Sequence, residues 1–205
     1  MAGKTTSLAR RFDQQVSSLE STRQKMESLF SRNEVNRDDI EHVYAGLFLD
    51  VFTEFEALIE ALFIGLLSGN LYSPTRNIVR KVRISPSAEV RNVVFGGRSY
   101  LDWLPYKNYT LKRAKLYFNS PEPFGILNST EKSNLRFYHI IRNAFAHKSG
   151  KALREFNNLI AGLSLLPYEK RPGGFLRSRP SSISPQTQFE IAVFELRVIA
   201  GKICA

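Results

Sequence analysis

A helical stripe of large apolar side chains in the second quarter of the chain is the feature that most constrains its fold. At about 100° per residue, these side chains fall on one broad face of a helix. They are Phe48, Val51, Phe52, Phe55, Ile59, Leu62, Phe63 and Leu66. Asn36 or Asp38 can cap the start of this helix, and Gly69-Asn70 can end it. The pattern therefore predicts a long helix over residues 38–69, which we expect to form the centre of the core.

Charged residues make this helix unsuitable for crossing a membrane. Its most apolar part, residues 47–67, contains Asp50, Glu54, Glu56 and Glu60, whereas a helix that spans a bilayer tolerates few or no charges. The first twelve residues carry basic side chains but lack the apolar segment of a secretory signal. We therefore expect a cytoplasmic protein without a membrane partner.

Residues that form disulfides or bind metals are scarce. The single cysteine, Cys204, excludes an intramolecular disulfide framework and a multi-cysteine zinc site. The histidines are His42, His139 and His147, and no two of them have the spacing of a close pair of metal ligands. We expect neither a metal ion nor any other cofactor.

Helical spacing and helix-ending residues divide the rest of the chain. Asn128 and Glu131 match a capping box, which would open a helix there. The predicted elements are an N-terminal helix in residues 1–35, the acidic core helix 38–69, a basic irregular insertion at 71–127 with a short helix over 111–118, a motif helix over 128–149, a helix over 151–166, a flexible loop at 167–185 and a C-terminal helix over 186–203. Together they predict one all-α domain over residues 1–205, a helical bundle with the irregular basic insertion between its core helices.

Positive charge is concentrated in that insertion. The chain carries a net charge of +10, and residues 71–118 hold ten basic and two acidic side chains. Residues 38–60, by contrast, hold seven acidic side chains and no lysine or arginine. This separation favours a surface that faces a polyanion. The alternative is the ordinary charge of solvated helices and loops.

Aromatic side chains alternate with the bases of the insertion. They are Tyr100, Trp103, Tyr106, Tyr109 and Tyr117. Aromatic rings beside bases that bind phosphate suit unpaired RNA. The predicted RNA-binding residues are Lys107, Lys112, Arg113 and Lys115, together with Lys148 at the end of the motif helix. The alternative is that the aromatic rings pack the insertion over the bundle.

Residues 140–148, Ile-Ile-Arg-Asn-Ala-Phe-Ala-His-Lys, carry the candidate chemistry. The inward face of their helix is predicted to be Leu135, Tyr138, Ile141 and Phe145. Arg142 and Asn143 project to the other side, and His147 lies at its edge, about 7.5 Å further along the helix axis than Arg142. An arginine can hold phosphate oxygens in two hydrogen bonds, while an imidazole can move a proton near neutral pH.

The pattern Arg142-Asn143-(three residues)-His147, late in a helical bundle, resembles the signature of the HEPN superfamily. In that signature an arginine, four to six residues and a histidine follow one another, and a polar residue, often asparagine, comes directly after the arginine. The acidic residues 50–60 also look like the acidic helix of bacterial HEPN proteins. The resemblance covers residues 38–149 in the order of elements, and the final helix fits as well.

The resemblance implies a metal-independent endoribonuclease, in which a ribose 2′-hydroxyl attacks the adjacent phosphate and leaves a 2′,3′-cyclic phosphate. His147 would be the general base or acid, Arg142 would stabilise the transition state, and Asn143 would orient the phosphate or the histidine. Two such motifs would face each other across the cleft of a homodimer. The resemblance also implies a toxin or anti-phage effector, with an antitoxin or a larger defence complex as partner.

Two carboxylates are candidate accessory residues, and other functions remain open. Glu56 falls beside the apolar stripe, where a partly buried carboxylate would seek a cation such as Arg142; Glu54 is the second choice. Arg142 and His147 could instead simply neutralise a helix C-terminus, and we expect His139 to be a surface or interface residue. The rival functions are a non-catalytic HEPN-like module that binds RNA or nucleotide or assembles a complex, and a dimerisation domain whose basic half docks on an acidic partner.

Overall fold

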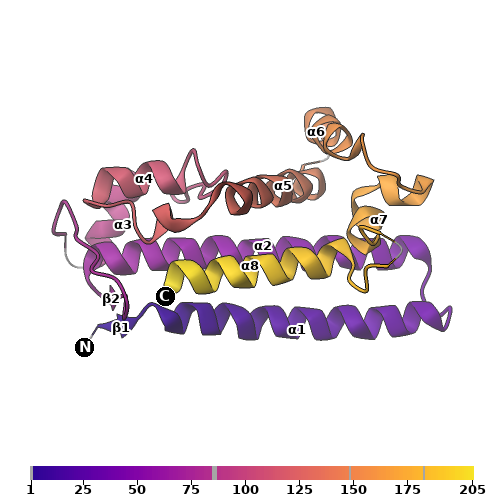
Figure 1. Cartoon of the computed structure of the whole chain (residues 1–205), viewed down its shortest axis with the longest axis horizontal. Coiled ribbons are helices and arrows are strands. Elements are labelled where there is room, and N and C mark those ends of the chain that lie inside the picture. Colours follow the sequence, from indigo (N-terminus) through magenta and orange to yellow (C-terminus); the bar gives the residue numbers. More distant parts are fainter. Residues whose placement is uncertain (1, 85–86, 148, 182) are drawn as a thin grey trace. The chain divides into compact units, whose positions relative to one another are not determined.

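The computed structural model describes residues 2–84, 87–147, 149–181 and 183–205, and the fold over these residues is all-α, as predicted (Figure 1). The helices are α1 (Thr6–Ser31), α2 (Arg37–Ser68), α3 (Ser87–Phe95), α4 (Thr110–Tyr117), α5 (Ser129–Ala146), α6 (Gly150–Ile160), α7 (Pro172–Arg177) and α8 (Gln188–Cys204), with 3-10 helices η1 (Phe124–Ile126) and η2 (Pro167–Lys170). Two short strands, β1 (Gly3–Lys4) and β2 (Leu71–Tyr72), pair in parallel, with Gly3 opposite Leu71.

Local hydrogen bonds explain where the two helices most important for the prediction begin. At the start of α2, the Asn36 side chain accepts from the Asp39 N–H at 2.9 Å, and the Asp39 carboxylate accepts from the Asn36 N–H at 3.1 Å. Asn128 and Glu131 make the same reciprocal pair before α5, at 2.8 and 2.7 Å. These capping boxes satisfy backbone donors that have no partner within the helix. Of the two candidates for the cap of α2, the structure thus selects Asn36, and α2 ends where Gly69 adopts a positive φ of 80°.

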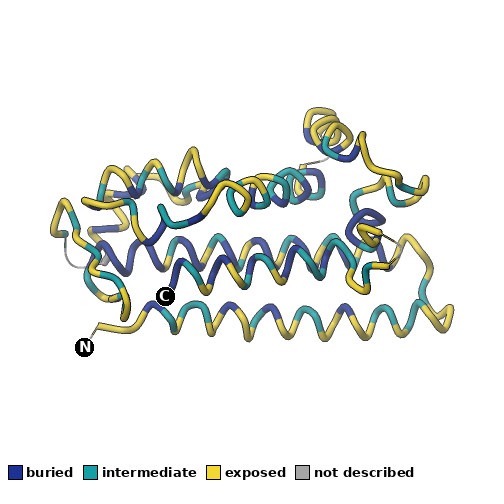
Figure 2. Tube along the Cα trace, in the orientation of Figure 1, coloured by how far each residue is buried: buried dark blue, intermediate teal, exposed yellow. Residues whose placement is uncertain are grey.

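The chain packs as two compact units, and each contains parts of α1, α2, α5 and α8. Unit 1 comprises Met1–Asp13, Glu54–Arg136 and Leu196–Ala205, and unit 2 comprises Gln14–Thr53 and Phe137–Glu195. Buried positions recur along the whole of α2 and α8, whereas α1 has buried residues only at intervals (Figure 2). The prediction of one domain over residues 1–205 stays a prediction.

The core of unit 1 surrounds Phe63 of α2. The ring centroid of Phe63 lies 5.2 Å from that of Trp103 and 5.3 Å from those of Phe118 and Phe124. All four side chains are buried. Because three of them come from residues 71–127, this segment contributes a large share of the aromatic area that the core of unit 1 removes from water.

The core of unit 2 combines aromatic packing with a cluster of buried and half-buried polar side chains. The ring of Phe48 on α2 lies 6.3 Å from Phe145 of α5 and 6.4 Å from Phe189 of α8. The polar cluster, which we call the Glu27 cluster, consists of Arg23, Glu27, Tyr44, Arg177 and Glu190. Glu27 is its centre, because its carboxylate accepts hydrogen bonds from both Tyr44 and Arg177.

The insertion at 71–127 is more regular than predicted. It contains α3, α4 and η1, and an antiparallel bridge joins Arg80 to Phe118. The short helix expected over residues 111–118 is confirmed as α4. The prolines and glycines of this segment separate short helices, and do not prevent them.

The segment 167–185, predicted as a flexible loop, contains η2 and α7. Its glycines allow close packing: a Cβ on Gly173 would lie 2.8 Å from the Cβ of Glu41, and one on Gly174 would lie 2.0 Å from the Tyr168 carbonyl oxygen. Arg171 adds ion pairs to α2. The prediction was wrong over residues 167–177 because glycine and proline suit tight turns and close contacts as well as flexible chain.

The motif helix also ends earlier than predicted, at Ala146 instead of 149. Ser149 is the N-cap of the next helix, and its side chain accepts from the Ala152 N–H at 3.3 Å. Gly150 therefore begins α6 and does not end the motif helix. The helix expected over 151–166 stops at Ile160.

Candidate functional site

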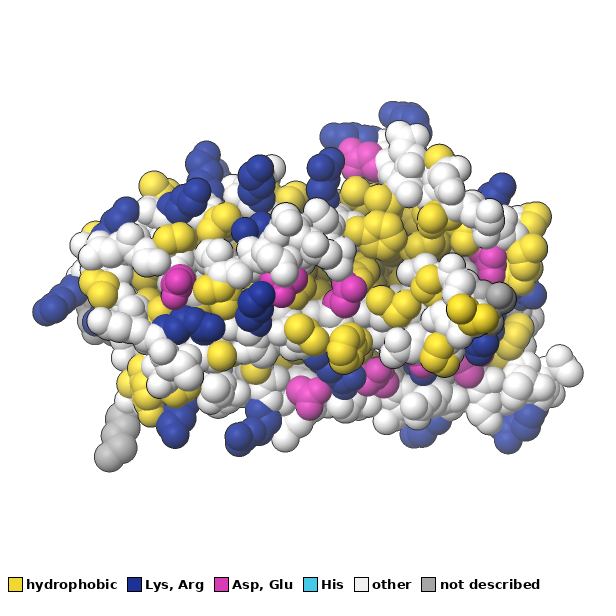
Figure 3. All heavy atoms as spheres, in the orientation of Figure 1, with side chains coloured by type: hydrophobic (Ala, Val, Ile, Leu, Met, Phe, Trp, Pro, Cys, Tyr) yellow, Lys and Arg dark blue, Asp and Glu magenta, His cyan; other side chains and the backbone are white. Residues whose placement is uncertain are grey.

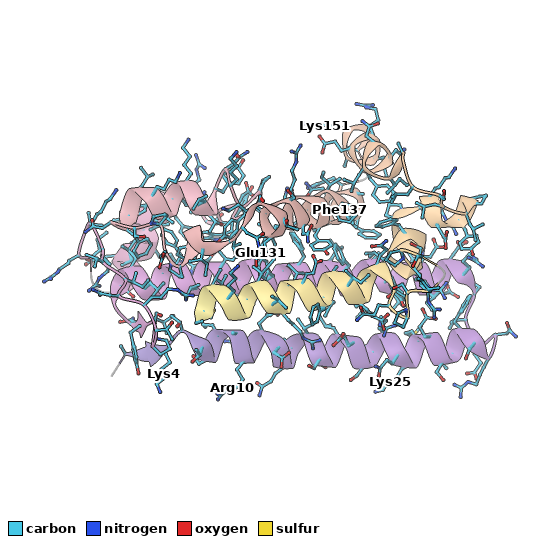
Figure 4. All side chains as sticks on the ribbon, in the orientation of Figure 1. Lys4, Arg10, Lys25, Glu131, Phe137 and Lys151 are labelled. Atoms are coloured by element: carbon cyan, nitrogen blue, oxygen red, sulfur yellow. The ribbon has the colours of Figure 1, made fainter. Side chains whose placement is uncertain are left out.

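The last turns of α5 present the candidate catalytic residues. Leu135, Tyr138 and Ile141 are buried as predicted, and Phe145 is half-buried. The Tyr138 hydroxyl donates to the carboxylate of Glu195 on α8 at 2.6 Å. Phe137, on the same helix, packs with its ring 6.0 Å from that of Phe175 (Figure 4). These contacts in unit 2 fix the rotation of α5 and so decide which side chains it turns toward solvent.

Arg142 and Asn143 are half-buried and linked to each other. The Arg142 guanidinium donates to Asn143 Oδ1 at 3.2 Å, and Asn143 Nδ2 lies 3.0 Å from His139 Nε2. Because a guanidinium can only donate, the atom that faces it must be the amide oxygen, which leaves the NH₂ group toward His139. His139 Nε2 is then the acceptor of this hydrogen bond.

His139 is therefore connected to the candidate site, because it contacts Asn143, which in turn binds Arg142. Its ring lies 6.2 Å from that of Phe52 on α2, so packing on one side and Asn143 on the other fix its position. The sequence contained a signal for this contact, because Asn143 is four residues from His139 and also four residues from His147. Spacing alone could not choose between the two histidines.

His147 lies just beyond the end of α5 and is exposed. Its backbone N–H donates to the Asn143 carbonyl at 2.9 Å, which holds the first residue after the helix in place. Over the described residues, the imidazole makes no hydrogen bond or ion pair with another side chain. The Asn143 side chain contacts Arg142 and His139, and its expected role of orienting the phosphate or His147 stays a prediction.

The candidate accessory carboxylates, Glu54 and Glu56, are both half-buried on α2. They belong to unit 1, whereas Arg142 belongs to unit 2. Their pairing with Arg142 stays a prediction. Lys148, a predicted RNA-binding residue, lies outside the described residues.

The other predicted RNA-binding residues come together around α4 in unit 1. Lys107, Lys112 and Lys115 are exposed and line a hollow of about 550 Å³. Lysine and arginine side chains project from the surface in this part of the molecule (Figure 3). The remaining lining residues are Asn108, Tyr109 and Leu111. We call this hollow the α4 pocket.

Arg113 differs from these lysines because it is half-buried. Its guanidinium lies 5.1 Å from the ring centroid of Trp103 and 5.5 Å from that of Tyr109, and it donates to the Asp102 carbonyl. Burial lowers the pKa of Arg113 from its ordinary value. Arg113 therefore holds the pocket wall together, and the lysines supply the accessible charge.

The aromatic residues of the insertion divide between the two predicted roles. Trp103 and Tyr106 are buried, and the Tyr106 hydroxyl donates to the Phe124 carbonyl at 3.0 Å. Tyr100 and Tyr109 are exposed over 72% and 39% of their surface. Tyr117 is half-buried, and its ring lies 5.9 Å from that of Phe63. The packing alternative therefore holds for Trp103 and Tyr106, while Tyr100 and Tyr109 expose a ring that a ligand can reach.

Metal sites, membrane-spanning helices and known relatives are three further features that can indicate a function. In the part of the chain that the structure describes, no group of three or more His, Cys, Asp or Glu residues is placed to hold a metal ion. None of the described helices combines the length and the apolar character that a bilayer crossing requires. Comparisons of the chain with protein-family models, with curated proteins and with solved structures give no match.

Proposed function

We propose that this protein is a metal-independent endoribonuclease of the HEPN type, in which Arg142 and His147 of two protomers act on one phosphodiester. The observation that carries the proposal is the arrangement at the end of α5. The exposed imidazole of His147 comes five residues after Arg142, whose guanidinium is hydrogen-bonded to Asn143. A catalytic histidine must be accessible so that it can exchange protons with the substrate. An arginine that stabilises the transition state must be held in a fixed position.

The reaction needs no water and no metal in its first step. The 2′-oxygen gives its proton to one imidazole and forms a bond to phosphorus, while the bond from phosphorus to the 5′-oxygen breaks. The departing 5′-oxygen takes a proton from a second, protonated imidazole. The products are a 2′,3′-cyclic phosphate and a 5′-hydroxyl. Arg142 would bind the non-bridging oxygens as their negative charge grows.

This chemistry requires a base and an acid on opposite sides of the phosphate, and each chain contributes a single His147. A homodimer with two-fold symmetry would supply the second His147. The proposal therefore includes a dimer of twice 23.4 kDa. Asn143 and His139 are positioning residues in this scheme, because they act on substrate through Arg142.

The proposal also includes a toxin or anti-phage role, with an antitoxin or a defence complex as partner. This role is supported by the resemblance to the HEPN superfamily alone. It leads to a simple expectation in cells: expression of the protein slows growth, and expression of the His147→Ala variant at the same level does not.

The test is incubation with total RNA in EDTA, followed by mapping of the cut ends. We expect cyclic phosphate ends that disappear with Arg142→Ala and with His147→Ala. Matched controls are Arg136→Ala, on the same helix, and His42→Ala, since both of these side chains are exposed. Each control should cut as the unaltered protein does. Loss of one general acid–base group costs about 10²- to 10⁴-fold in rate.

Two results would contradict the proposal, the first in its function and the second in its assignment of the catalytic residue. If RNA binds but is not cut by the unaltered protein, the chain is a binding or assembly module. If cutting persists in His147→Ala, another residue carries the proton, and the assignment of the site is wrong.

A further inference from the structure

The α4 pocket is a second site, separate in the sequence from the motif at the end of α5. We propose that it binds unpaired RNA, with one base stacked on Tyr109 and the neighbouring phosphates held by Lys107, Lys112 and Lys115. The inference rests on the proposed function in one respect: RNA would be the substrate, and this pocket would select its unpaired stretches.

The backbone around the pocket is held in place by hydrogen bonds within the protein. The Pro105 carbonyl accepts from the N–H groups of Asn108 and Tyr109 at 3.0 and 3.1 Å, and the Tyr106 carbonyl accepts from the Leu111 N–H at 2.9 Å. The Thr110 hydroxyl, fully buried, donates to the Trp103 carbonyl. The turn that leads into α4 is thus anchored to the core of unit 1, and its exposed side chains are presented from a fixed backbone.

Three ammonium groups line the pocket without a compensating charge. None of the six lining residues is acidic, and no carboxylate pairs with Lys107, Lys112 or Lys115 in the described part of the chain. Lys112 and Lys115 are three residues apart on α4, a spacing at which like charges destabilise a helix. An anion in the pocket would relieve this repulsion, and such unfavourable local arrangements are typical of functional sites.

The aromatic side of the pocket indicates which anion. Tyr109 is exposed, and the Arg113 guanidinium, itself close to the Trp103 ring, lies 5.5 Å from its centroid. This contact holds the tyrosine ring at the pocket wall. A ring beside several phosphate-binding bases is the combination that proteins use for single strands, because each base offers a face for stacking and each phosphate a charge.

Shape and residue type favour an unpaired strand over a duplex. A base can stack on a protein side chain only when it is free of its partner, and the bases of an A-form duplex are not accessible in this way. The accessible basic residues are lysines, which act as mobile point charges, whereas the arginine is engaged with the protein. The pocket should therefore bind the backbone with little preference for sequence. Its volume of about 550 Å³ is sufficient for a nucleotide.

The binding test uses the unaltered protein and a fluorescently labelled, unstructured RNA of about twelve nucleotides in which every ribose is 2′-O-methylated. Without a free 2′-hydroxyl the oligonucleotide cannot be cut by the proposed reaction, so anisotropy measures binding alone. A hairpin of the same length and methylation represents paired RNA. The variants are Tyr109→Ala and the double variant Lys112→Gln/Lys115→Gln. The control is Lys25→Gln, because Lys25 projects from α1 into solvent (Figure 4).

We expect Tyr109→Ala to weaken binding of the single strand by between about fivefold and about 150-fold, which corresponds to the loss of one stacked base. The double lysine variant should reduce the slope of log K against log salt by about 1.4, or about 0.7 for each phosphate that a lysine no longer neutralises. The hairpin should bind more weakly than the single strand, and Lys25→Gln should bind as the unaltered protein does.

Binding by both pocket variants that equals that of Lys25→Gln would overturn the inference, as would tighter binding of the hairpin than of the single strand. These outcomes are distinct from failure of the proposed nuclease. If RNA is cut but the pocket variants bind and cut normally, the pocket proposal fails alone. If the pocket variants lose binding but no RNA is ever cut, the nuclease proposal fails alone.

Discussion

Removal of the Glu27 carboxylate tests how much the Glu27 cluster contributes to the stability of unit 2. The carboxylate accepts two hydrogen bonds from Arg177, at 2.9 and 3.1 Å, and one from the Tyr44 hydroxyl at 2.8 Å. Burial raises the pKa of the Tyr44 hydroxyl to about 12, so Tyr44 stays a donor throughout the neutral range. The Glu27→Ala variant leaves both donors without their acceptor.

The expected magnitude follows from these contacts and their exposure. A hydrogen bond to a charged group contributes about 1.5–3 kcal/mol when it is buried, and breaking a buried ion pair costs about 3–5 kcal/mol. The side chains of Arg177 and Glu27 are 17% and 32% exposed, so water replaces part of what is lost. We expect Glu27→Ala to lower the free energy of unfolding by about 2–3 kcal/mol, or the Tm by about 4–12 °C for a chain of this length.

The effect should also depend on pH. Burial raises the pKa of Glu27, but the hydrogen bonds from Arg177 and Tyr44 together lower it below its ordinary value of 4.5. A carboxyl group with a lowered pKa stabilises the fold above its pKa in the unfolded chain, and this contribution disappears as the pH falls through its pKa in the folded protein. The difference between the unaltered protein and Glu27→Ala should therefore be largest at neutral pH and shrink below about pH 4.5.

Urea unfolding followed by circular dichroism measures both effects. The control is Glu34→Ala, which removes an exposed ion pair to Arg32 whose side chains are 52% and 58% exposed. This pair should contribute about 0.5 kcal/mol or less. Equal losses in the two variants, or a loss from Glu27→Ala that does not change with pH, would refute the assignment of stability to the Glu27 cluster.

Three further predictions concern the candidate site and the two units. Asn143→Ala should lower the rate of RNA cleavage on the order of 10- to 100-fold, with a smaller change in KM. Asn143→Asp keeps an acceptor for the guanidinium and should lower the rate less, so equal kinetics in both variants would contradict a positioning role. Gly174→Ala should destabilise the fold in thermal unfolding because its Cβ would lie 2.0 Å from a carbonyl oxygen, while Gly162→Ala, which has open space around it, should leave the Tm within about 2 °C. Phe63→Ala should lower the free energy of unfolding by about 3–5 kcal/mol, and Phe194→Ala, whose side chain is 59% exposed, should cost far less; similar losses would show that Phe63 is not central to the core of unit 1.

The elements that the sequence predicted well are those whose evidence is local. The stripe on α2 repeats over many turns, and the capping boxes at Asn36 and Asn128 lie within four residues of the backbone groups that they satisfy. Helix starts of this kind depend on little else in the chain. The prediction of α2 and α5 therefore needed no knowledge of their neighbours.

Much of what the sequence left open or predicted wrongly concerns residues whose role is decided by partners far away in the sequence. Trp103 belongs to the core because Phe63 lies 5.2 Å from it, and no periodic pattern in residues 71–127 announces this contact. In the sequence alone, Gly173 and Gly174 suggest a flexible segment. In the structure they allow the close approach of Glu41 and Tyr168. Tertiary contacts of this kind override local preference.

The candidate site shows the same division. The spacing of Arg142 and His147 can be read from the sequence, and the structure places His147 just after the end of α5. Which of the two equally spaced histidines contacts Asn143 depends on side-chain rotamers and on the packing of His139 against Phe52. Such side-chain contacts are set by tertiary packing, and the spacing of residues in the sequence does not specify them.

The parallel pairing of β1 with β2 has a practical consequence for rearranging the chain. The Gly3 N–H donates to the Asn70 carbonyl at 2.8 Å, and the Ser73 hydroxyl donates to the Ala205 carbonyl at the same distance. Both described ends are thus fastened to one four-residue stretch of unit 1. A short glycine–serine linker could join them, and fresh ends could be opened at the exposed Gly96-Gly97 turn. Because joined ends and an exposed opening are the conditions that circular permutation needs, a chain that starts at Gly97 and finishes at Gly96 should still fold.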